Sequence, residues 1–570
     1  MKHQKLFCLG AILLLATLSI MAQTSAQQSA AGDKHRHHHY KLIDLGTFGG
    51  PQSYLYFPNN YAPVLNNRGT VAGWADTSKK DPYPKFCFNE DCFVSDTFQT
   101  QNGELTNLGA LKQGVSSATS WISPNGLIAG LSENGKTDPL VPGFPEFRAV
   151  LWEDGNIRDL GTLPEGGYES IANAVNSGGL VVGMATNKTP DSHSIFGLGY
   201  ETRAFRWDNQ NGMEDLGTLG GTDAEALLVN EQGQIVGVSY TNSSASAYCS
   251  QSFGLSLTTG AFLWQKGKMT DLGNFGGTCT FPADLNERGQ VVGISTLTGD
   301  RFQHAFLWNG GSLNALPNAL GGHNGAAIAL NNTADVTGWA TLPGDQVIHA
   351  SLWKNSIMTD LGTADGDQCS YGYSINARRQ VVGVSVPACD FNLQRAFLWE
   401  HGSITDLNTL IPPASPLYLS FPETINDRGE IAGVGFDSGN NQHAFLLIPC
   451  DKNHLGVAGC DYSLADSVAA IPESAVPVMH GPTTTAPRNA RGGSTLRRQR
   501  QIHPLSNPVS DDSSSFPNWE QQLAPEGHAM QEFDALRGGR CARRGMQCPP
   551  WIKCCPGLTC VPASTRAYCE

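Results

Sequence analysis

Eight copies of one short unit recur through most of this 570-residue chain. The clearest copy of its first element is Asn286–Gly293, which reads Asn, two residues, Gly, one residue, two aliphatic residues and Gly. The other copies begin at Asn66, Ser123, Asn176, Asn230, Asn331, Asn376 and Asn426. Since successive copies start 45 to 57 residues apart, the sequence predicts a repeated supersecondary unit.

Two further elements also occur eight times, in fixed order. An Asp-Leu-Gly element precedes each copy of the first, and its first positions are Asp44, Asn107, Asp159, Asp215, Asp271, Ala315, Asp360 and Asp406. An Ala-Phe-Leu-Trp element begins at Ala149, Ala204, Ala261, Ala305, Ala350, Ala396 and Ala444, with a degenerate copy around Phe98. These short runs, closed by Asn, Gly and Asp, are typical of strands joined by tight turns.

A four-stranded unit of this length favours an all-β fold, a β-propeller of about eight four-stranded blades. The repeats open on a strand at residues 40–45 and finish on a strand at 443–447. We therefore expect the last strand to complete the first blade, which closes the ring without an exposed edge. Seven blades remain an alternative, if the degenerate unit from Phe98 to Gly130 is an insertion.

The sequences His304-Ala-Phe-Leu-Trp308, His349-Ala350 and His443-Ala-Phe445, with Asp-Leu-Gly-Thr and Asn-x-x-Gly-x-Val-Val-Gly, resemble the bacterial HAF-family extracellular repeat proteins. The resemblance covers residues 40–448 and implies an exported bacterial repeat protein. It implies no catalytic mechanism. This chain departs from the pattern at Arg148, Arg203 and Arg395, which stand where the histidine is expected.

The N-terminus predicts export. Lys2 and Lys5 precede an apolar run from Leu6 to Met21 and then small residues, the pattern of a secretory signal peptide. We expect a protein that is secreted, or periplasmic, and that has no membrane span. A net charge of −14 disfavours nucleic acid as a partner, and we expect a monomer.

The chain divides by composition into five segments. We expect a signal peptide at 1–26, a His-rich leader at 27–39, the propeller at 40–449, a flexible linker at 450–540 and a cysteine-rich module at 541–570. The leader histidines can bind a divalent metal, but a solvated leader is the preferred interpretation. The linker is rich in Pro, Ser, Thr and Arg.

Fourteen cysteines remain after the predicted signal peptide, an even number for an oxidising compartment. Local pairing predicts four disulfides, Cys87–Cys92, Cys249–Cys279, Cys369–Cys389 and Cys450–Cys460. The last 30 residues hold six more cysteines and predict a disulfide scaffold, for which fifteen pairings are possible. Their spacing resembles an inhibitor cystine knot, which implies Cys541–Cys555, Cys548–Cys560 and Cys554–Cys569.

Strand alternation predicts that the long loops emerge on one face of the ring, here called the long-loop face, and the tight turns on the other, the turn face. The candidate ligand-binding residues on the long-loop face are Tyr54, Tyr56, Tyr168, Glu169, Asp223, Glu225, His323, Asp365, Asp367, Tyr371 and Tyr418. Aromatic and acidic neighbours of this kind suit a neutral sugar or a peptide. A merely solvated surface is the alternative.

Other repeated residues have structural interpretations. The His or Arg of each unit is expected to pair with the Asp of the adjacent strand, as Arg395 with Asp406. The tryptophans at 152, 207, 264, 308, 353 and 399 are expected between blades.

No motif specifies a catalytic residue, a metal site or a cofactor, and we expect none of them. The sequence favours a secreted, non-enzymatic repeat protein that binds an extracellular glycan or protein ligand through its long-loop face. A propeller enzyme acting on polysaccharide and a structural cell-surface protein are the alternatives.

Overall fold

The computed structural model describes residues 39–55, 63–89, 91–101, 103–389 and 393–460, and four short strands near the C-terminus. The chain divides into two units, Met1–Pro508 and Val509–Glu570. The first contains the propeller. The predicted signal peptide, nearly all of the leader, Tyr56 and most of the predicted linker lie outside the described residues.

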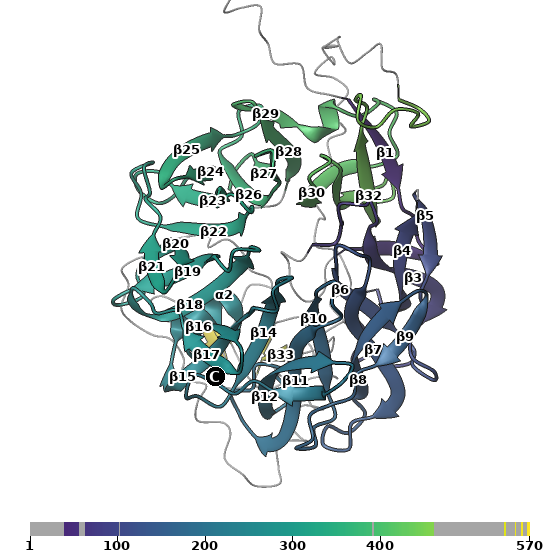
Figure 1. Ribbon diagram of the computed structural model, residues 1–570, viewed down its shortest axis with the longest axis vertical. Coiled ribbons are helices and arrows are strands. Elements are labelled where there is room, and N and C mark those ends of the chain that lie inside the picture. Colours follow the sequence, from purple (N-terminus) through teal and green to yellow (C-terminus); the bar gives the residue numbers. More distant parts are fainter. Residues whose placement is uncertain are drawn as a thin grey trace, which may run out of the picture. The chain divides into compact units, whose positions relative to one another are not determined.

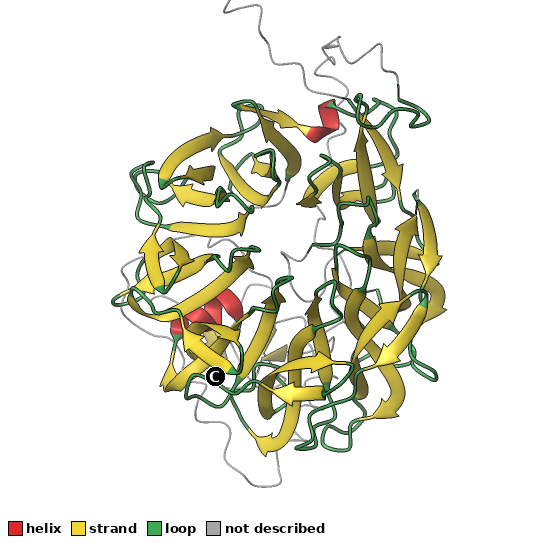
Figure 2. Cartoon of the chain, viewed as in Figure 1, coloured by secondary structure: helices red, strands yellow, loops and turns green. Residues whose placement is uncertain are grey.

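The first unit consists of four-stranded antiparallel sheets that follow one another around a ring (Figures 1 and 2). The first four are blade 1, β2 (Gly49–Tyr54), β3 (Ala72–Lys80), β4 (Phe93–Gln101) and β5 (Glu104–Asn107); blade 2, β6 (Ser117–Ile122), β7 (Ile128–Thr137), β8 (Pro145–Glu153) and β9 (Asn156–Asp159); blade 3, β10 (Ser170–Val175), β11 (Val181–Pro190), β12 (Tyr200–Asp208) and β13 (Gly212–Asp215); and blade 4, β14 (Ala224–Val229), β15 (Ile235–Ala245), β16 (Leu257–Gln265) and β17 (Lys268–Asp271).

The ring continues through four more blades, and one parallel bridge, Thr259 opposite Cys279, joins the sheets of blades 4 and 5. These are blade 5, β18 (Gly276–Leu285), β19 (Val291–Leu297), β20 (Gln303–Asn309) and β21 (Ser312–Ala315); blade 6, β22 (Gly325–Leu330), β23 (Val336–Thr341), β24 (Ile348–Lys354) and β25 (Ile357–Gly362); blade 7, β26 (Cys369–Ile375), β27 (Val381–Val386), β28 (Arg395–Glu400) and β29 (Ser403–Asp406); and blade 8, β30 (Tyr418–Ile425), β31 (Ile431–Phe436), β32 (Gln442–Pro449) and β1 (Tyr40–Asp44). In the described part of the ring, the helices between strands are α2 (Ala247–Phe253) and the 3-10 helix η1 (Leu407–Thr409).

The ring has eight blades, because the degenerate unit around Phe98 supplies regular strands rather than an insertion. The strand β1 pairs with β32, from Tyr40 opposite Pro449 to Asp44 opposite Phe445. This is the expected pairing of the first and last strands, and the shared blade consists of three C-terminal strands and one N-terminal strand. Both ends of the repeat region are thereby fixed in one sheet.

The second glycine of each repeat is explained by the strand beside it. Gly237 of β15 lies opposite Phe262 of β16, and the same Gly–Phe pair occurs in six of the eight blades. A Cβ at Gly237 would lie 2.0 Å from the Glu225 carbonyl oxygen and 2.5 Å from the Phe262 ring. Only glycine lets the phenylalanine pack flat on the sheet.

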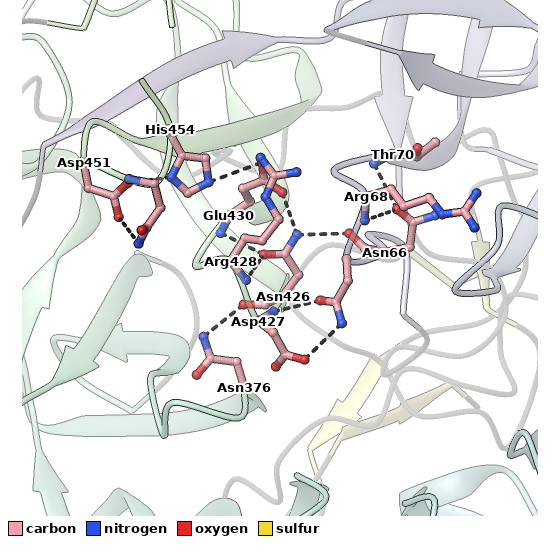
Figure 3. Close-up of polar contacts among 12 residues, drawn as sticks. Asn66, Arg68, Thr70, Asn376, Asn426, Asp427, Arg428, Glu430, Asp451 and His454 are labelled. Atoms are coloured by element: carbon pink, nitrogen blue, oxygen red, sulfur yellow. Dashed lines mark hydrogen bonds and ion pairs between the residues drawn. The ribbon is translucent and has the colours of Figure 1, made fainter. Parts of the chain in front are cut away.

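The asparagine that opens each turn joins neighbouring blades. Asn230 Nδ2 donates to Asn286 O (3.0 Å), and Asn286 Nδ2 donates to Asn331 O (3.1 Å). The last copy closes the circle, because Asn426 Nδ2 donates to Asn66 O at 3.0 Å, 360 residues away (Figure 3). In blade 2, Ser123 has no amide, and Asn125 Nδ2 donates to Ser177 O instead. This asparagine ring therefore fastens the whole turn face.

The expected cross-strand pairs are present in part. Arg203 pairs with Asp215 (2.9 Å), His349 with Asp360 (3.0 Å) and His443 with Asp44 (3.0 Å). Arg395 lies 3.8 Å from Asp406, but its closer partner is Asp367 at 3.0 Å. Arg148 pairs instead with Glu146 (2.9 Å). Trp152, Trp207, Trp308 and Trp353 are buried, and Trp264 and Trp399 are half-buried.

The structure contains the disulfides Cys87–Cys92, Cys249–Cys279, Cys369–Cys389 and Cys450–Cys460, the same four pairs that the sequence predicts in this region. Residues 450–460, at the start of the predicted linker, form a loop closed by the last of them. Cross-links of this kind restrict the unfolded chain and so stabilise the fold.

In the second unit, β33 (Cys541–Ala542) pairs in parallel with β34 (Lys553–Cys554), and β35 (Cys560–Pro562) pairs antiparallel with β36 (Ala567–Cys569). The side chains of this unit, and with them the cystine-knot pairings, lie outside the described residues. Among the residues that the structure does describe, no helix has the length and apolar character needed to cross a membrane.

Candidate functional site

Most of the long-loop candidates are interior residues. Glu169, Asp223 and Glu225 are fully buried, Tyr371 is almost so, and Tyr54 stacks on Trp74 with ring centroids 4.0 Å apart. The loops of blades 1 and 2 add aromatic packing, with Phe88 against Phe147 at 5.3 Å. Much of the long-loop face is therefore hydrophobic core that continues into the loops.

Two of the buried acids tie neighbouring blades together. Glu169 Oε2 accepts a hydrogen bond from the backbone N–H of Phe147 (2.6 Å), and Asp223 Oδ2 accepts from Ile195 (2.7 Å). Asn324 stands at the same place in blade 6 and accepts from Gln303 N (3.1 Å). These side chains cap backbone groups between blades and do not face solvent, which is a structural role.

Burial also makes these acids hard to ionise. It raises the pKa of Asp223 to about 8, with a further contribution from Asp191, and it raises the pKa of Glu169 well above its usual range. In blades 1 and 2, burial raises the pKa of Asp76 and of Glu133 to about 8, and the charges of Asp91 and Asp81 respectively add to the rise.

Asp223→Asn is expected to change how stability depends on pH. Folding raises the pKa of this carboxyl. Such a group contributes its full stabilisation when the pH is below its pKa in the unfolded chain, and this contribution is lost as the pH rises through its pKa in the folded protein. The variant should match the wild type near pH 4 and unfold at a higher urea concentration near pH 8.

Asp208→Asn is the control of opposite sign. Its half-buried carboxylate accepts hydrogen bonds from Asn211, which lower its pKa, so the substitution should reduce stability slightly at neutral pH and not at acid pH. Identical urea midpoints of D223N and wild type at pH 8 would contradict the buried-acid interpretation.

The remaining long-loop candidates are more accessible. His323 is exposed, stacks on Phe302 (4.7 Å) and pairs with Asp345 (2.8 Å). Tyr168 and Tyr418 are half-buried and Asp365 is exposed, whereas Asp367 is buried in its pair with Arg395. No described cavity unites these residues.

A cavity of about 290 Å³ lies at the opposite, turn-face end of the channel. Asn66, Asn230, Asn376 and Asn426 of the asparagine ring line it, together with the last residues of the inner strands. Its aromatic side chains are Trp121 and Tyr373. Here we call it the channel mouth.

The lining of the channel mouth is acidic. Among the described residues that line it there is no lysine, arginine or histidine, and there are five carboxyl groups, Glu231, Asp284, Glu287, Glu423 and Asp427. Several already accept backbone hydrogen bonds: Asp284 Oδ2 from Leu330 (2.8 Å) and Glu287 Oε2 from Glu231 (3.0 Å). Those carboxyls that are ionised give the cavity a negative potential, because no basic side chain of the described lining offsets them.

Of the five carboxyl groups, Glu423 is the one that a β-bulge places at the channel mouth. An extra residue bulges from the inner strand of blade 8 between Pro422 and Thr424, and that residue is Glu423. The same bulge carries Asn173 in blade 3 and Tyr373 in blade 7. Burial raises the pKa of Glu423 well above its usual range, and burial raises that of Asp284 to about 6.

None of the channel-mouth acids was among the sequence-predicted candidates. The signal that would have shown Glu423 is the alignment of the repeats, where its position holds Ser120, Asn173 or Tyr373 in other blades. Among the described residues, no group of three or more His, Cys, Asp or Glu side chains is arranged to hold a metal ion.

No family model matches the chain, and no curated protein matches it. Solved structures similar to it include a puromycin-hydrolyzing peptidase of Mycobacterium tuberculosis (13% identity, 69% of this chain and 61% of that chain, TM-score 0.34). An oligogalacturonate lyase in complex with manganese (11%, 73% and 99%, 0.34) and a dipeptidyl peptidase 4 of Porphyromonas gingivalis (9%, 62% and 65%, 0.32) are also similar. These likenesses concern the fold and assign no activity.

Proposed function

We propose that this protein is a secreted, non-enzymatic repeat protein that binds an extracellular glycan or peptide. The ligand enters the channel mouth of the propeller. The observation that supports this most is the acidic cavity there, which is lined by five carboxyl groups and by no basic side chain among the described residues. A concave site with a few convergent polar groups is the usual form of a ligand site.

The charge of the cavity indicates the group that enters it. A protonated amine, as in an amino sugar or a basic side chain, offsets the negative potential and donates hydrogen bonds to the carboxylates. Trp121 and Tyr373 supply apolar surface beside those acids. The volume of about 290 Å³ suits one sugar ring or one side chain rather than a long segment.

Export is part of the proposal. The predicted signal peptide and the resemblance to HAF-family repeat proteins both favour it, and four disulfides are compatible with an oxidising compartment. The cystine-knot-like segment would be a second, small binding module on a flexible linker, and two weak sites on one chain would gain avidity.

A polysaccharide enzyme remains the second candidate, because Asp284 and Glu423 have pKa values shifted by burial in one cavity. Both carboxylate oxygens of Asp284 already accept backbone hydrogen bonds, from Leu330 and Leu285, at 2.8 Å each. An acid engaged in this way supports the fold, and this favours binding over catalysis.

The test is a binding array of cell-wall polymers, amino sugars and basic peptides, probed with the oxidised full-length protein, with release of reducing ends measured in parallel. Glu423→Gln should weaken binding of the selected amine ligand about tenfold or more, the effect of losing one charged hydrogen bond. Wild-type affinity should rise as the pH increases above the usual range of a carboxyl group, because Glu423, whose pKa is raised by burial, must lose its proton to pair with the amine. E423Q should reduce this rise.

Glu104→Gln, on the exposed outer strand β5, is the matched control and should bind normally. A double variant, Tyr168→Ala with His323→Ala, tests the long-loop face. Loss of binding in this double variant, together with normal binding in E423Q, would place the ligand site on the long-loop face. Release of reducing ends would establish the enzyme, and absence of any ligand would favour a structural cell-surface role.

A further inference from the structure

We infer that a second groove, at the edge of the turn face under blades 7 and 8, binds an anionic group on an oligosaccharide. The groove has a volume of about 680 Å³. It lies between the turn Asn376–Gln380, the hairpin turn at Glu400 and His401, and the disulfide-closed loop Cys450–Cys460. We call it the basic groove.

Its exposed side chains are mostly basic. Arg378, Arg379, His401 and Lys452 line the groove and are exposed, in a chain whose net charge is −14. The two acids of the lining, Glu400 and Asp451, are buried and engaged: Gln380 Nε2 donates to Glu400 (2.7 Å), and His454 bonds Asp451 (2.7 Å). The accessible surface of the groove is therefore positive.

Two of the four bases are available for a ligand. Arg379 pairs with Asp335 at 2.8 Å. In the described part of the chain, no ion pair joins Arg378 or Lys452 to a carboxylate. A cation left without a counter-charge at a concave surface attracts an anion, and an arginine binds a carboxylate or sulfate through two parallel hydrogen bonds.

Arg378 is exposed, and its guanidinium lies close to the turn of blade 8. A Cβ on Gly429 would lie 2.4 Å from Arg378 Nη2, so the guanidinium packs directly over the turn of blade 8. It is also close enough to Tyr40 to oppose the rise that burial causes in the pKa of that hydroxyl.

The opposite wall of the groove is fixed. The disulfide Cys450–Cys460 closes the loop, and His454 inserts between Asp451 (2.7 Å) and Glu430 (3.7 Å). Glu430 in turn pairs with Arg428 at 3.1 Å (Figure 3). The groove is therefore formed before a ligand arrives.

The size and polarity of the groove favour a small anionic sugar over a nucleic acid. Its volume lies within the range of small-ligand sites. Asn453 and Gln380 offer amides to hydroxyl groups. The overall charge of −14 repels a long polyphosphate, whereas a single carboxylate or sulfate is attracted locally by Arg378 and Lys452. The basic groove is separate from the acidic channel mouth, and its ligand must carry an acidic group rather than an amine.

The experiment measures binding of three oligosaccharides of equal length, one carboxylated, one sulfated and one neutral, to the oxidised full-length protein by calorimetry. We expect one of the anionic sugars to bind and the neutral one not to bind. The double variant Arg378→Gln with Lys452→Gln should lower that affinity at least tenfold, and raising the salt concentration should weaken wild-type binding.

Arg288→Gln is the matched control, because Arg288 is exposed at the same position of the blade 5 turn and lies outside the groove. It should bind like the wild type. The carboxylated and sulfated arms identify which anion is preferred. Equal binding of the neutral sugar, unchanged affinity in the double variant, or no binding of either anionic sugar at millimolar concentration would each overturn the proposal.

Discussion

Gly237→Ala is expected to lower the free energy of unfolding by about 3 kcal/mol or more, at the upper end of what overpacking costs. The new Cβ would lie 2.0 Å from the Glu225 carbonyl oxygen and 2.5 Å from Phe262 Cζ. The carbonyl belongs to the inner strand β14, so relief of the clash requires β14 to separate from β15. Urea unfolding followed by tryptophan fluorescence measures the loss.

Gly267→Ala separates this clash from a purely conformational effect. Gly267 has φ +79 and no heavy atom within 4 Å of its Cβ position, so alanine meets only the strain of a left-handed backbone, about 1 to 2 kcal/mol. If the two variants unfolded at the same urea concentration, close packing of Phe262 on Gly237 would not explain the repeated glycine.

Asn426→Ala is expected to lower the free energy of unfolding by about 4 kcal/mol, because the side chain makes four hydrogen bonds at about 1 kcal/mol each. Its Nδ2 donates to Asn66 O (3.0 Å) and Glu430 Oε2 (2.6 Å), and its Oδ1 accepts from the backbone N–H groups of Arg428 and Glu430. The first of these bonds closes the ring between blade 8 and blade 1.

The natural sequence supplies a graded control. Ser123 occupies the same position in blade 2, where its Oγ accepts from Leu127 N (2.8 Å) but makes no bond to the next blade. Asn426→Ser should therefore keep part of the hydrogen bonding within the turn, and its free energy of unfolding should fall by about half as much as that of N426A. Asn314→Ala, on the exposed outer strand β21, should change stability by less than about 0.5 kcal/mol. Equal effects of N426A and N314A would contradict the role of the ring.

Much of the fold was accessible from the repeats. The three elements occur eight times, which favours eight blades over the alternative of seven, and the strands that open and close the repeat region predict the pairing of β1 with β32. The repeated His or Arg opposite Asp predicts the pairs at Arg203, His349 and His443. Local spacing likewise predicts the four disulfides. These features depend on strand order and short distances along the chain, which the sequence contains directly.

The candidate site depended on which side of each inner strand faces the channel. The inner strands of blades 2 to 8 each contain a register shift at an extra residue, which locally reverses the alternation of inward and outward side chains, and those of blades 5 and 8 contain a second shift. Neither the bulge nor the burial of Glu169 and Asp223 is visible in the local sequence, where acids next to loops look solvent-exposed.

The repeats specify the architecture of this protein, because a repeat that cannot bury its own faces must stack against its neighbours. Which polar residues are available to a ligand depends instead on the folded ring. Closure of the ring brings Glu231, Glu423 and Asp427 from distant parts of the chain into one cavity, and it places Arg378 beside Lys452. Such convergence depends on the curvature of the whole ring, which no single repeat specifies.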